Sequence, residues 1–523
     1  MSRNEAALAA MPGHDERTPL LSPTSTDSLL AQDLSSDENR IKKKPLISRF
    51  HVVFFLIASV LVVSGVADGI FDPATTRLIE DAYCRRYYRA HDSSMVGLDV
   101  QNGIPEQFCK LPAVQGDVAL LRGWLMFLEA GTSLIFAPIF GWVADRYTRK
   151  WVAVLLMCSF ALRSLWISTV LYFPKTIKIE LIMLASMHTV LGGSSAGANS
   201  LLYTILTDVT PEQKRVATFF RLGGASMSSM LISPPIASAL MKANVWTAIL
   251  VGLGLYVINA VMCLLLPETL PEVSKSGHSM APRNSDMGHE TANTIPDFLK
   301  KAREKVHYMT SFVIEDSRVL LLLPPFMFHM LLMDRSLILQ YTSIRFGMPL
   351  SDATLFIGIR GGFTLVYFLI VMPIIMDRIQ SSTRWPRTRL SVRHSDLLLG
   401  RISAISLFFA FLATAAAPII PLFVVALFIQ ALGLGITYFL RGLLTSFVGQ
   451  HQLARLFTVI TVVDALGLMV GSPGLAWVFE KGMSANVPGL LWLVVALGVF
   501  LTSVGMFFVS KREVEGVLDE ASE

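Results

Sequence analysis

The sequence GWVADRYTRK, Gly141–Lys150, separates two apolar stretches near residues 119–143 and 151–173. Each stretch is long enough to cross the hydrocarbon core of a bilayer as a helix, which takes about 20 residues. One Asp, two Arg and one Lys gather in the short segment between them. Arg and Lys hold such a loop on the cytosolic side of a membrane. The segment therefore predicts two membrane-spanning helices joined by a cytosolic loop.

The chain as a whole is too apolar for a soluble protein. Of its 523 residues, 53% are hydrophobic and 16% are charged, and the mean hydropathy is +0.56. Apolar runs of about 20 residues recur along most of the length, as spanning helices require. The sequence lacks the short alternating segments that are typical of a transmembrane β-barrel. The expected fold class is therefore an all-α polytopic membrane protein.

The sequence carries no motif of a known enzyme class. It has no Gly-Lys-Ser/Thr phosphate-binding loop and no pair of His or Cys at metal-binding spacing. We therefore expect a protein that is not an enzyme, that needs neither a cofactor nor a metal, and that has no nucleic-acid partner.

Twelve apolar stretches are predicted to span the membrane, with ends defined to within about three residues. They lie near residues 50–70, 119–143, 151–173, 179–206, 216–241, 246–266, 319–341, 353–376, 397–416, 421–445, 456–479 and 488–510. A polar segment divides them six and six. The predicted domains are a disordered tail, a six-helix bundle, a central loop, a second six-helix bundle and a short tail, at residues 1–45, 46–270, 271–316, 317–512 and 513–523.

The distribution of Arg and Lys sets the orientation of these spans. With the N-terminus in the cytosol, the loops that are densest in positive charge also face the cytosol, as the positive-inside rule requires. Both termini are then cytosolic, and the loop predicted at residues 71–118 faces the outside or a lumen. That loop contains Cys84 and Cys109, which an oxidising compartment would allow to form a disulfide.

The N-terminal tail is polar and rich in Ser, Asp, Pro and Lys, a composition typical of disordered segments. Its residues Glu16, Leu20 and Leu21 resemble an acidic dileucine sorting signal, which adaptor proteins read in eukaryotes. An adaptor partner would direct the chain to the vacuole or another endomembrane. The alternative is a chance match, which leaves the plasma membrane open as the location.

The loop motif Gly-x-x-x-Asp-Arg-x-x-Arg-Lys resembles the loop after the second helix in transporters of the major facilitator superfamily. Their usual pattern has Gly where this chain has Thr148. Weak internal symmetry points the same way, because Met376-Asp377-Arg378 ends the eighth span as Ala144-Asp145-Arg146 ends the second. The resemblance covers about residues 50–510 and extends to features of fungal members. It implies two pseudo-symmetric six-helix bundles.

In that superfamily the loop acts as a conformational latch. The resemblance assigns this role to Gly141, Asp145, Arg146, Arg149, Lys150 and Asp208. It implies that Arg149 pairs with Asp208 at the end of the fourth span. It also implies that Asp145 contacts the start of the eleventh span near Arg455. Ion pairs suit a latch because separating buried partners is costly. The alternative is a loop that only anchors the topology.

Ionisable side chains within the spans are candidates for proton coupling or for structural ion pairs, because charge at membrane depth is expensive. The candidates are Glu129, Arg163, His188, Asp334, Arg360 and Asp464. We expect Glu129 to pair with Arg163 of the adjacent span, and Asp334 to pair with Arg360. His188 stands where proton-coupled members carry Arg, and a histidine can change charge near neutral pH. A hydrogen-bonded structural histidine is the alternative.

The first, fourth, seventh and tenth spans line the central cavity in this superfamily. The resemblance places six polar side chains there, which are Asn199, Tyr203, Gln340, Tyr341, Gln430 and Tyr438. An apolar cavity with a few amides and phenols suits an amphipathic organic solute better than phosphate or a sugar.

The predicted function is secondary active transport of a small organic solute by alternating access. We expect a monomer that exports a secondary metabolite or drug-like compound and is driven by protons. The fifth span does not settle the direction, because Ser233 replaces the Gly that precedes Pro234 in the export signature. Proton-linked nutrient uptake is therefore the first alternative. A non-transporting membrane sensor or scaffold is the second.

Overall fold

The computed structural model describes residues 46–92, 104–192, 195–211, 215–269, 313, 316–380, 392–448 and 452–509. The candidate sorting signal Glu16, Leu20 and Leu21 lies outside these ranges, as do the C-terminal tail and almost all of the central loop. Every regular element in the described ranges is helical. The all-α fold class predicted from composition is thus confirmed.

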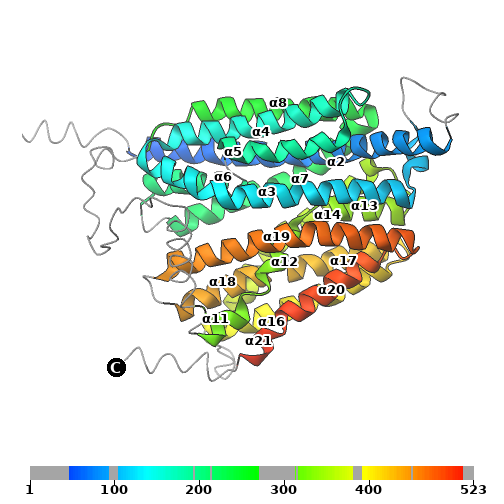
Figure 1. The fold of residues 1–523 in the computed structure, drawn as a ribbon. Coiled ribbons are helices and arrows are strands. Elements are labelled where there is room, and N and C mark those ends of the chain that lie inside the picture. The colour runs from blue at the N-terminus through cyan, green and yellow to red at the C-terminus, as the bar shows by residue number, and fades with distance from the viewer. Residues whose placement is uncertain are drawn as a thin grey trace, which may run out of the picture. The chain divides into compact units, whose positions relative to one another are not determined.

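The described part of the first half is a bundle of long helices together with a few short helical elements (Figure 1). They are α2 (Leu46–His91), η2 (Glu106–Cys109), α3 (Pro112–Arg146), α4 (Arg149–Tyr172), η3 (Ile179–Met187), α5 (His188–Gly192), α6 (Ser195–Val209), α7 (Arg215–Ala243) and α8 (Val245–Leu264). The helix α2 runs about 20 residues beyond the predicted end of the first span. The predicted outer loop is therefore largely helical.

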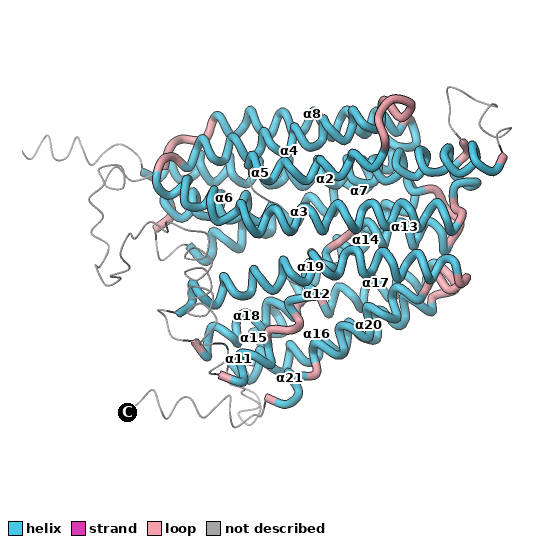
Figure 2. The backbone as a smooth tube through the Cα atoms, in the orientation of Figure 1, coloured by secondary structure: helices cyan, strands magenta, loops and turns pink. Residues whose placement is uncertain are grey.

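The second half follows the same plan with more interruptions (Figure 2). Its elements are α11 (Ser317–Leu322), α12 (Phe326–Met333), α13 (Ser336–Arg345), α14 (Leu350–Val366), the π-helical turn η5 (Tyr367–Val371), α15 (Met372–Gln380), α16 (Val392–Ala416), α17 (Ile420–Gly433), α18 (Ile436–Phe447), α19 (Leu453–Ser484), α20 (Leu490–Ser503) and α21 (Gly505–Phe508).

Local sequence explains where several of these helices begin and end. The side chains of Thr148 and Asn244 accept hydrogen bonds from the first turns of α4 and α8, as N-cap residues do. Pro112 occupies the first turn of α3, where its missing N–H group costs nothing. Pro324 and Pro325 separate α11 from α12, because proline cannot donate the hydrogen bond that would continue a helix.

Ten described helical stretches are long and apolar enough to cross a membrane. The helix α7 and the segment α11–α13 occupy the remaining two of the twelve predicted positions. Serines and two prolines lower the hydropathy of α7. The seventh predicted span is broken between α12 and α13 at Asp334 and Arg335. Helical elements thus occupy all twelve predicted positions in the described ranges, and ten of these stretches meet the length and hydropathy of a membrane span.

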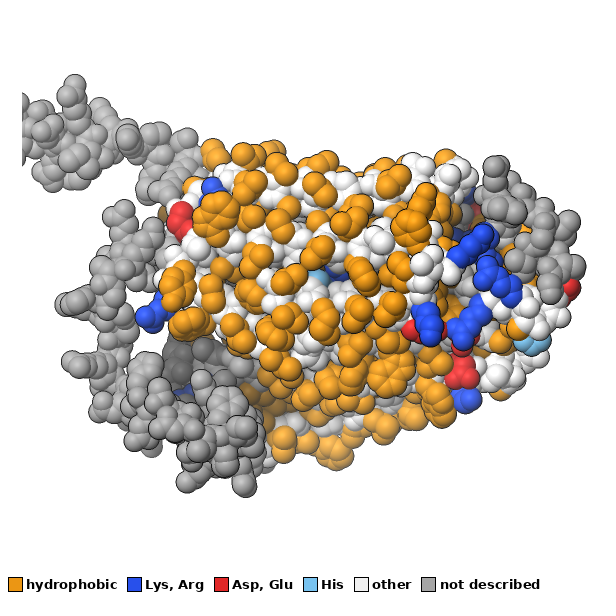
Figure 3. All heavy atoms as spheres, turned by 45° about the horizontal axis from the view of Figure 1, so that its top comes forward, with side chains coloured by type: hydrophobic (Ala, Val, Ile, Leu, Met, Phe, Trp, Pro, Cys, Tyr) orange, Lys and Arg blue, Asp and Glu red, His pale blue; other side chains and the backbone are white. Residues whose placement is uncertain are grey.

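The helices of each half pack mainly on one another, for example α4 on α8 and α16 on α17 and α20. The halves are joined mainly by two helix pairs, α3 with α19 and α7 with α14, and α13 also contacts α3. In the space-filling view, apolar side chains cover the middle of the visible face, and charged side chains gather toward its ends (Figure 3). Large apolar side chains such as Leu250 and Phe409 are exposed. This surface fits contact with lipid, so the chain is a multi-pass membrane protein.

Candidate functional site

The loop between α3 and α4 is bound to the rest of the first half through Arg149. The guanidinium group of Arg149 forms an ion pair with Asp208 at the end of α6. The hydroxyl of Thr269 donates a second hydrogen bond to the same carboxylate, at 2.9 Å. The geometry thus joins the two residues that the superfamily resemblance had paired.

Glu268, after the end of α8, is a further partner of this loop that the sequence did not reveal. Its carboxylate accepts hydrogen bonds from the backbone N–H groups of Arg149 at 3.2 Å and Lys150 at 3.4 Å, and from the hydroxyl of Thr148. A carboxylate is favourable there because the N-terminus of a helix carries partial positive charge. Glu268 therefore fastens the start of α4 to the end of the first half.

Gly141, Trp142, Arg146 and Tyr147 of the loop are exposed, whereas Ala144 is buried. Arg146 lies over the ring of Trp142, with 5.6 Å between the guanidinium carbon and the ring centroid. A Cβ atom added to Gly141 would meet no atom within 4 Å. The side chain of Asp145 lies outside the described part of the structure, so its contact with the start of α19 stays a prediction.

Glu129, Arg163 and His188 form an acid–base cluster inside the first half. Arg163 Nη2 lies 3.3 Å from Glu129 Oε2, and His188 Nε2 lies 4.0 Å from Glu129 Oε1. The other ring nitrogen of His188 is 2.9 Å from the carbonyl oxygen of Ala185, which orients Nε2 toward the carboxylate. The side chain of Glu129 is 23% exposed. The Glu129 carboxylate thus contacts a guanidinium group and faces an imidazole inside a membrane-spanning bundle, where ionisable groups are rare.

Sequence reasoning missed a second ion pair, between the half-buried Asp72 of α2 and Arg122 of α3. Arg122 is almost fully buried and also donates to the hydroxyl of Thr76 at 2.8 Å. The pair was missed because Asp72 fell in the predicted outer loop, whereas α2 continues through it. Nearby, the hydroxyl of Tyr256 donates to Asp68.

The predicted pairing of Asp334 with Arg360 is not what the structure shows. Asp334 accepts hydrogen bonds from the backbone and the hydroxyl of Ser336, at 2.9 and 2.8 Å, and so caps α13. Arg360 donates to the carbonyl oxygen of Leu332 at the end of α12. Each charge binds backbone groups that the helix break leaves without helical partners, because such groups must be satisfied at membrane depth. A small cavity beside the break is lined in part by Leu331, Asp334, Arg360 and Trp492.

Asp464 pairs with Arg441, which approaches it from α18. Arg441 Nη2 lies 3.2 Å from Asp464 Oδ2, and the carboxylate side chain is 5% exposed. The guanidinium group also lies over the ring of Phe326, 5.6 Å from its centroid. This pair therefore joins α18, α19 and α12 within the second half.

The six predicted cavity residues divide into two sets. Asn199 and Tyr438 are exposed and Tyr203 is half-buried, and the two tyrosines are close enough to influence each other electrostatically. Gln340, Tyr341 and Gln430 are fully buried.

The buried set corrects the prediction for two residues. The hydroxyl of Tyr341 donates to the carbonyl oxygen of Thr414 at 2.8 Å, and the amide of Gln430 donates to the Thr414 hydroxyl at 2.8 Å. Both side chains thus face α16, inside the second half, rather than a cavity between the halves. The physical reason is that a buried phenol or amide needs a hydrogen-bond partner, which α16 provides.

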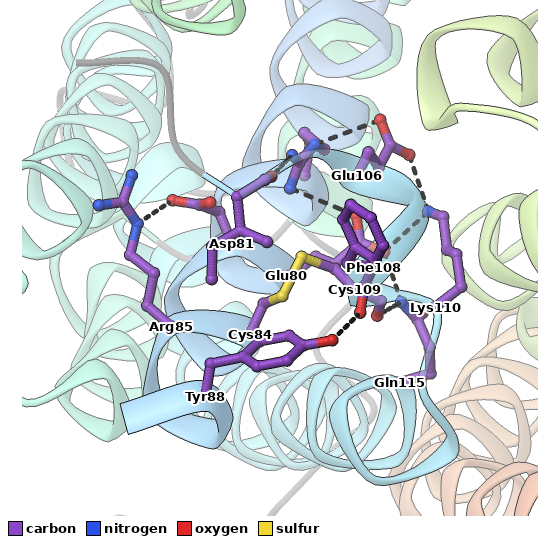
Figure 4. Close-up of a disulfide and its surroundings, with 12 residues drawn as sticks. Glu80, Asp81, Cys84, Arg85, Tyr88, Glu106, Phe108, Cys109, Lys110 and Gln115 are labelled. Atoms are coloured by element: carbon purple, nitrogen blue, oxygen red, sulfur yellow. Dashed lines mark hydrogen bonds and ion pairs between the residues drawn. A yellow bond between two sulfur atoms is a disulfide. The ribbon is translucent and has the colours of Figure 1, made fainter. Parts of the chain in front are cut away.

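The residues Cys84 and Cys109 are joined by a disulfide, which ties η2 to α2 (Figure 4). This disulfide lies at the start of α3, whereas the loop of Arg149 lies at its end. We call these two ends of the molecule the disulfide end and the loop end.

The two halves approach each other more closely toward the disulfide end. Along α3, a Cβ atom added to Gly116 would lie 2.7 Å from Glu480 Cγ, and one added to Gly123 would lie 2.9 Å from Ala476 Cβ. Further along, a Cβ atom on Gly131 would lie 3.7 Å from Met469 Sδ.

The second contact between the halves shows the same trend. A Cβ atom on Gly361 of α14 would lie 2.9 Å from the carbonyl oxygen of Met230 in α7, whereas one on Gly224 would lie 3.7 Å from Leu369 Cδ2. At the glycines compared, which include Gly358 with a Cβ position 3.2 Å from Pro234, the halves are in closer contact toward the disulfide end than toward the loop end.

Comparison with known proteins identifies the same type of molecule. The family model described as Major Facilitator Superfamily matches residues 118–472. The chain is 28% identical to the MFS-type transporter aprT of Aspergillus flavus, over 86% of this chain and 85% of that protein. It is 26% identical to the MFS efflux pump atnC of Emericella nidulans, over 83% and 82% of the two chains.

Solved structures show the same fold at lower sequence identity. The human organic anion transporter MFSD10 aligns with a TM-score of 0.52 at 16% identity, over 87% of this chain and 99% of that one. A bacterial homologue of the iron transporter ferroportin, in an inward-facing state, aligns with a TM-score of 0.56 at 12% identity, over 89% and 99%.

Proposed function

Since this chain belongs to the Major Facilitator Superfamily, and is therefore a membrane transporter, we propose that it exports a small amphipathic organic compound in exchange for protons. The observation that supports an alternating-access mechanism for this transport is the graded contact between the halves. Tight packing at one end and looser packing at the other is what a rocking mechanism produces in one of its two states. We assign the structure to the state that is open toward the loop end.

The residues at the open end support an amphipathic solute. Asn199, Tyr203 and Tyr438 offer one amide and two phenols on helices that lead to the loop end. Polar groups that are few and separated orient a mostly apolar ligand, whereas phosphate or a sugar needs several charged or amide groups together.

The proton-coupling step is assigned to Glu129. Its carboxylate contacts Arg163 and lies 4.0 Å from His188 Nε2, and ionisable groups of this kind within membrane spans are typical of coupling sites. Asp334 and Asp464 are weaker candidates, because Asp334 is committed to capping α13 and Asp464 is buried against Arg441.

The direction of transport is proposed from the relatives. The Emericella protein is named an efflux pump, and an efflux pump named ustT from Aspergillus flavus is 25% identical over 80% of each chain. Uptake of a nutrient with protons is the alternative. The loop end is assigned to the cytosol on the distribution of Arg and Lys, in either the vacuolar or the plasma membrane.

The test is untargeted metabolite profiling of cells and medium from a deletion strain and from strains that express the wild type or Glu129→Gln. Export predicts a compound that accumulates in deletion cells, falls in the medium, and is restored by the wild type only. Glu180→Gln, which removes an exposed acid on η3, is the matched control and should restore export. The opposite pattern between cells and medium would replace export with uptake. Full restoration by Glu129→Gln would remove proton coupling at this site.

A further inference from the structure

We propose that Glu106 is a positioning residue of the transport cycle, which fastens the two halves together at the disulfide end. The inference rests on the alternating access proposed above. It assigns a residue to the closed contact at the disulfide end, opposite the loop end where Arg149 and Asp208 lie. Glu106 lies in η2, just before Cys109, in a segment of the first half that carries no part of the superfamily loop motif.

The contact crosses between the halves at a helix start. Glu106 Oε1 accepts a hydrogen bond from the backbone N–H of Leu350 at 2.6 Å. Leu350 is the first residue of α14, whose preceding residue Pro349 offers no side-chain cap. The first N–H groups of a helix lack partners within the helix and carry partial positive charge. A carboxylate from the first half therefore supplies the cap that the second half does not provide for itself.

Glu106 is held in place by its own half before it meets α14. The disulfide ties η2 to α2, and both of its cysteines are fully buried. Lys110 Nζ lies 2.7 Å from Glu106 Oε1, and Arg77 Nε lies 3.2 Å from Glu106 Oε2. In Figure 4 a dashed line joins Glu106 to Lys110, close to the disulfide. The side chain thus presents a preformed cap to the second half.

This arrangement also makes the contact reversible. Glu80 shares Lys110 with Glu106, at 2.7 Å, and Arg77 lies 3.5 Å from Glu80. Two acids and two bases therefore remain paired within the first half when α14 moves away. Opening costs one hydrogen bond and leaves no carboxylate without a cation, so the cost is far below that of breaking a buried ion pair. A gate that must open in each cycle needs such a modest restraint.

A second contact reinforces the same end. Lys242 Nζ at the end of α7 lies 2.6 Å from Asp352 Oδ1 in the first turn of α14, and both side chains are largely exposed. The helix α14 is thus approached at its start from two elements of the first half. Exposed pairs of this kind contribute little on their own, so Glu106 is the stronger of the two polar restraints at the start of α14.

The test measures how often the disulfide end opens. A reporter cysteine is placed at Ala476, which is 1% exposed and lies against Gly123 in the closed interface. Cys158 and Cys263 are first replaced by Ser. The purified full chain in nanodiscs is labelled with a water-soluble maleimide without reductant. Glu106→Ala should raise the labelling rate about tenfold, because a hydrogen bond to a charged group shifts an equilibrium by about that factor.

Conservative and matched variants separate positioning from a general loss of structure. Glu106→Gln keeps an oxygen that can accept from Leu350, so its labelling rate should fall between wild type and Glu106→Ala. Glu180→Gln removes an acid that pairs with Arg86 within the first half, and its rate should equal wild type. Lys242→Gln removes only an exposed ion pair, and we expect a small rise in its labelling rate. This variant tests the same end of the molecule even if Glu106→Ala fails to fold.

A wedge variant tells failure of this inference from failure of alternating access. Trp at Gly361 cannot fit in the closed state, because a Cβ atom alone would lie 2.9 Å from Met230. Suppose that Gly361→Trp is labelled rapidly but Glu106→Ala and Lys242→Gln are labelled at the wild-type rate. This result would overturn the role of Glu106 and leave alternating access in place. A wild-type rate in Gly361→Trp as well would overturn both proposals. Equal increases in Glu106→Ala and Glu180→Gln would also refute the assignment to Glu106.

Discussion

Replacing Glu268 with Ala should loosen the start of α4 and little else. Its carboxylate accepts from the backbone N–H groups of Arg149 and Lys150, at 3.2 and 3.4 Å, and from the Thr148 hydroxyl. The two backbone contacts are long, so we take the low end of about 1.5 kcal/mol for hydrogen bonds to a charged group. The helix-dipole contribution adds about 0.5 kcal/mol. The expected loss is about 2 kcal/mol of local stability.

Hydrogen–deuterium exchange measures that local loss directly. About 2 kcal/mol corresponds to roughly a 30-fold faster exchange of the backbone amides in the first turn of α4, if they exchange through local opening. Glu268→Gln keeps an acceptor oxygen and loses the charge, so its effect should be several-fold smaller. The readout is peptide-level mass spectrometry of the purified protein in detergent.

The start of α8 provides the internal control. Asn244 caps α8 by accepting from Trp246 N at 2.8 Å, so exchange there should not respond to Glu268→Ala. Asn244→Ala should accelerate exchange at the start of α8 and leave exchange at the start of α4 unchanged. The capping argument fails if Glu268→Ala leaves exchange at the start of α4 unchanged, or if it accelerates α4 and α8 equally.

Three further predictions follow from the same contacts. Gly123→Trp should abolish export of the compound found by profiling, because even a Cβ atom there would lie 2.9 Å from Ala476 Cβ. Gly474→Trp should retain export, because a Cβ atom there meets nothing within 4 Å. An equal loss of export in the two variants would contradict the argument that α3 and α19 must close on each other at Gly123. Cys84→Ser should lower the melting temperature of the purified protein, because a disulfide across 25 residues contributes about 3 to 4 kcal/mol in the chain-entropy model. The free cysteine variant Cys158→Ser is its control, and an equal shift in both would argue against the role of the disulfide. Glu129→Gln should make export insensitive to an imposed pH gradient in vesicles, and retained sensitivity would move coupling to another acid.

The pattern of apolar stretches predicted the helices well, because burial in lipid requires about 20 apolar residues whatever the packing. It failed where a helix continues into water. The part of α2 from Pro73 to His91 is polar enough to read as a loop, yet it is helical and carries Cys84 and Glu80. Contacts made outside the membrane, among them the disulfide to Cys109 and the pair of Glu80 with Lys110, stabilise this extension, and no local pattern announces them.

Sequence reasoning also identified which charged residues stand at membrane depth, but only in part which residues they contact. Glu129 lies beside Arg163, as the adjacency of their spans predicted, whereas the partner of Asp464, Arg441, came from the structure. The sequence predicted a pair of Asp334 with Arg360 only because the two residues stand at a similar depth in the membrane. Their actual partners are backbone groups at a helix break, and the position of that break could not be read from the sequence.

The amino-acid sequence by itself determined that this chain is an all-α membrane transporter of the Major Facilitator Superfamily type, with its charged loop between α3 and α4. Those conclusions depend on the composition, on the length and recurrence of apolar stretches, and on one motif of fixed spacing. All three can be read from residues that are close together in the sequence. Only the tertiary structure decided that Glu268 caps α4, that Tyr341 and Gln430 face α16, and that Glu106 reaches the start of α14. These contacts join residues that lie between 16 and 244 positions apart in the chain. They are set by the rotation of the helices and by the approach of the two halves, which depend on packing across the whole molecule.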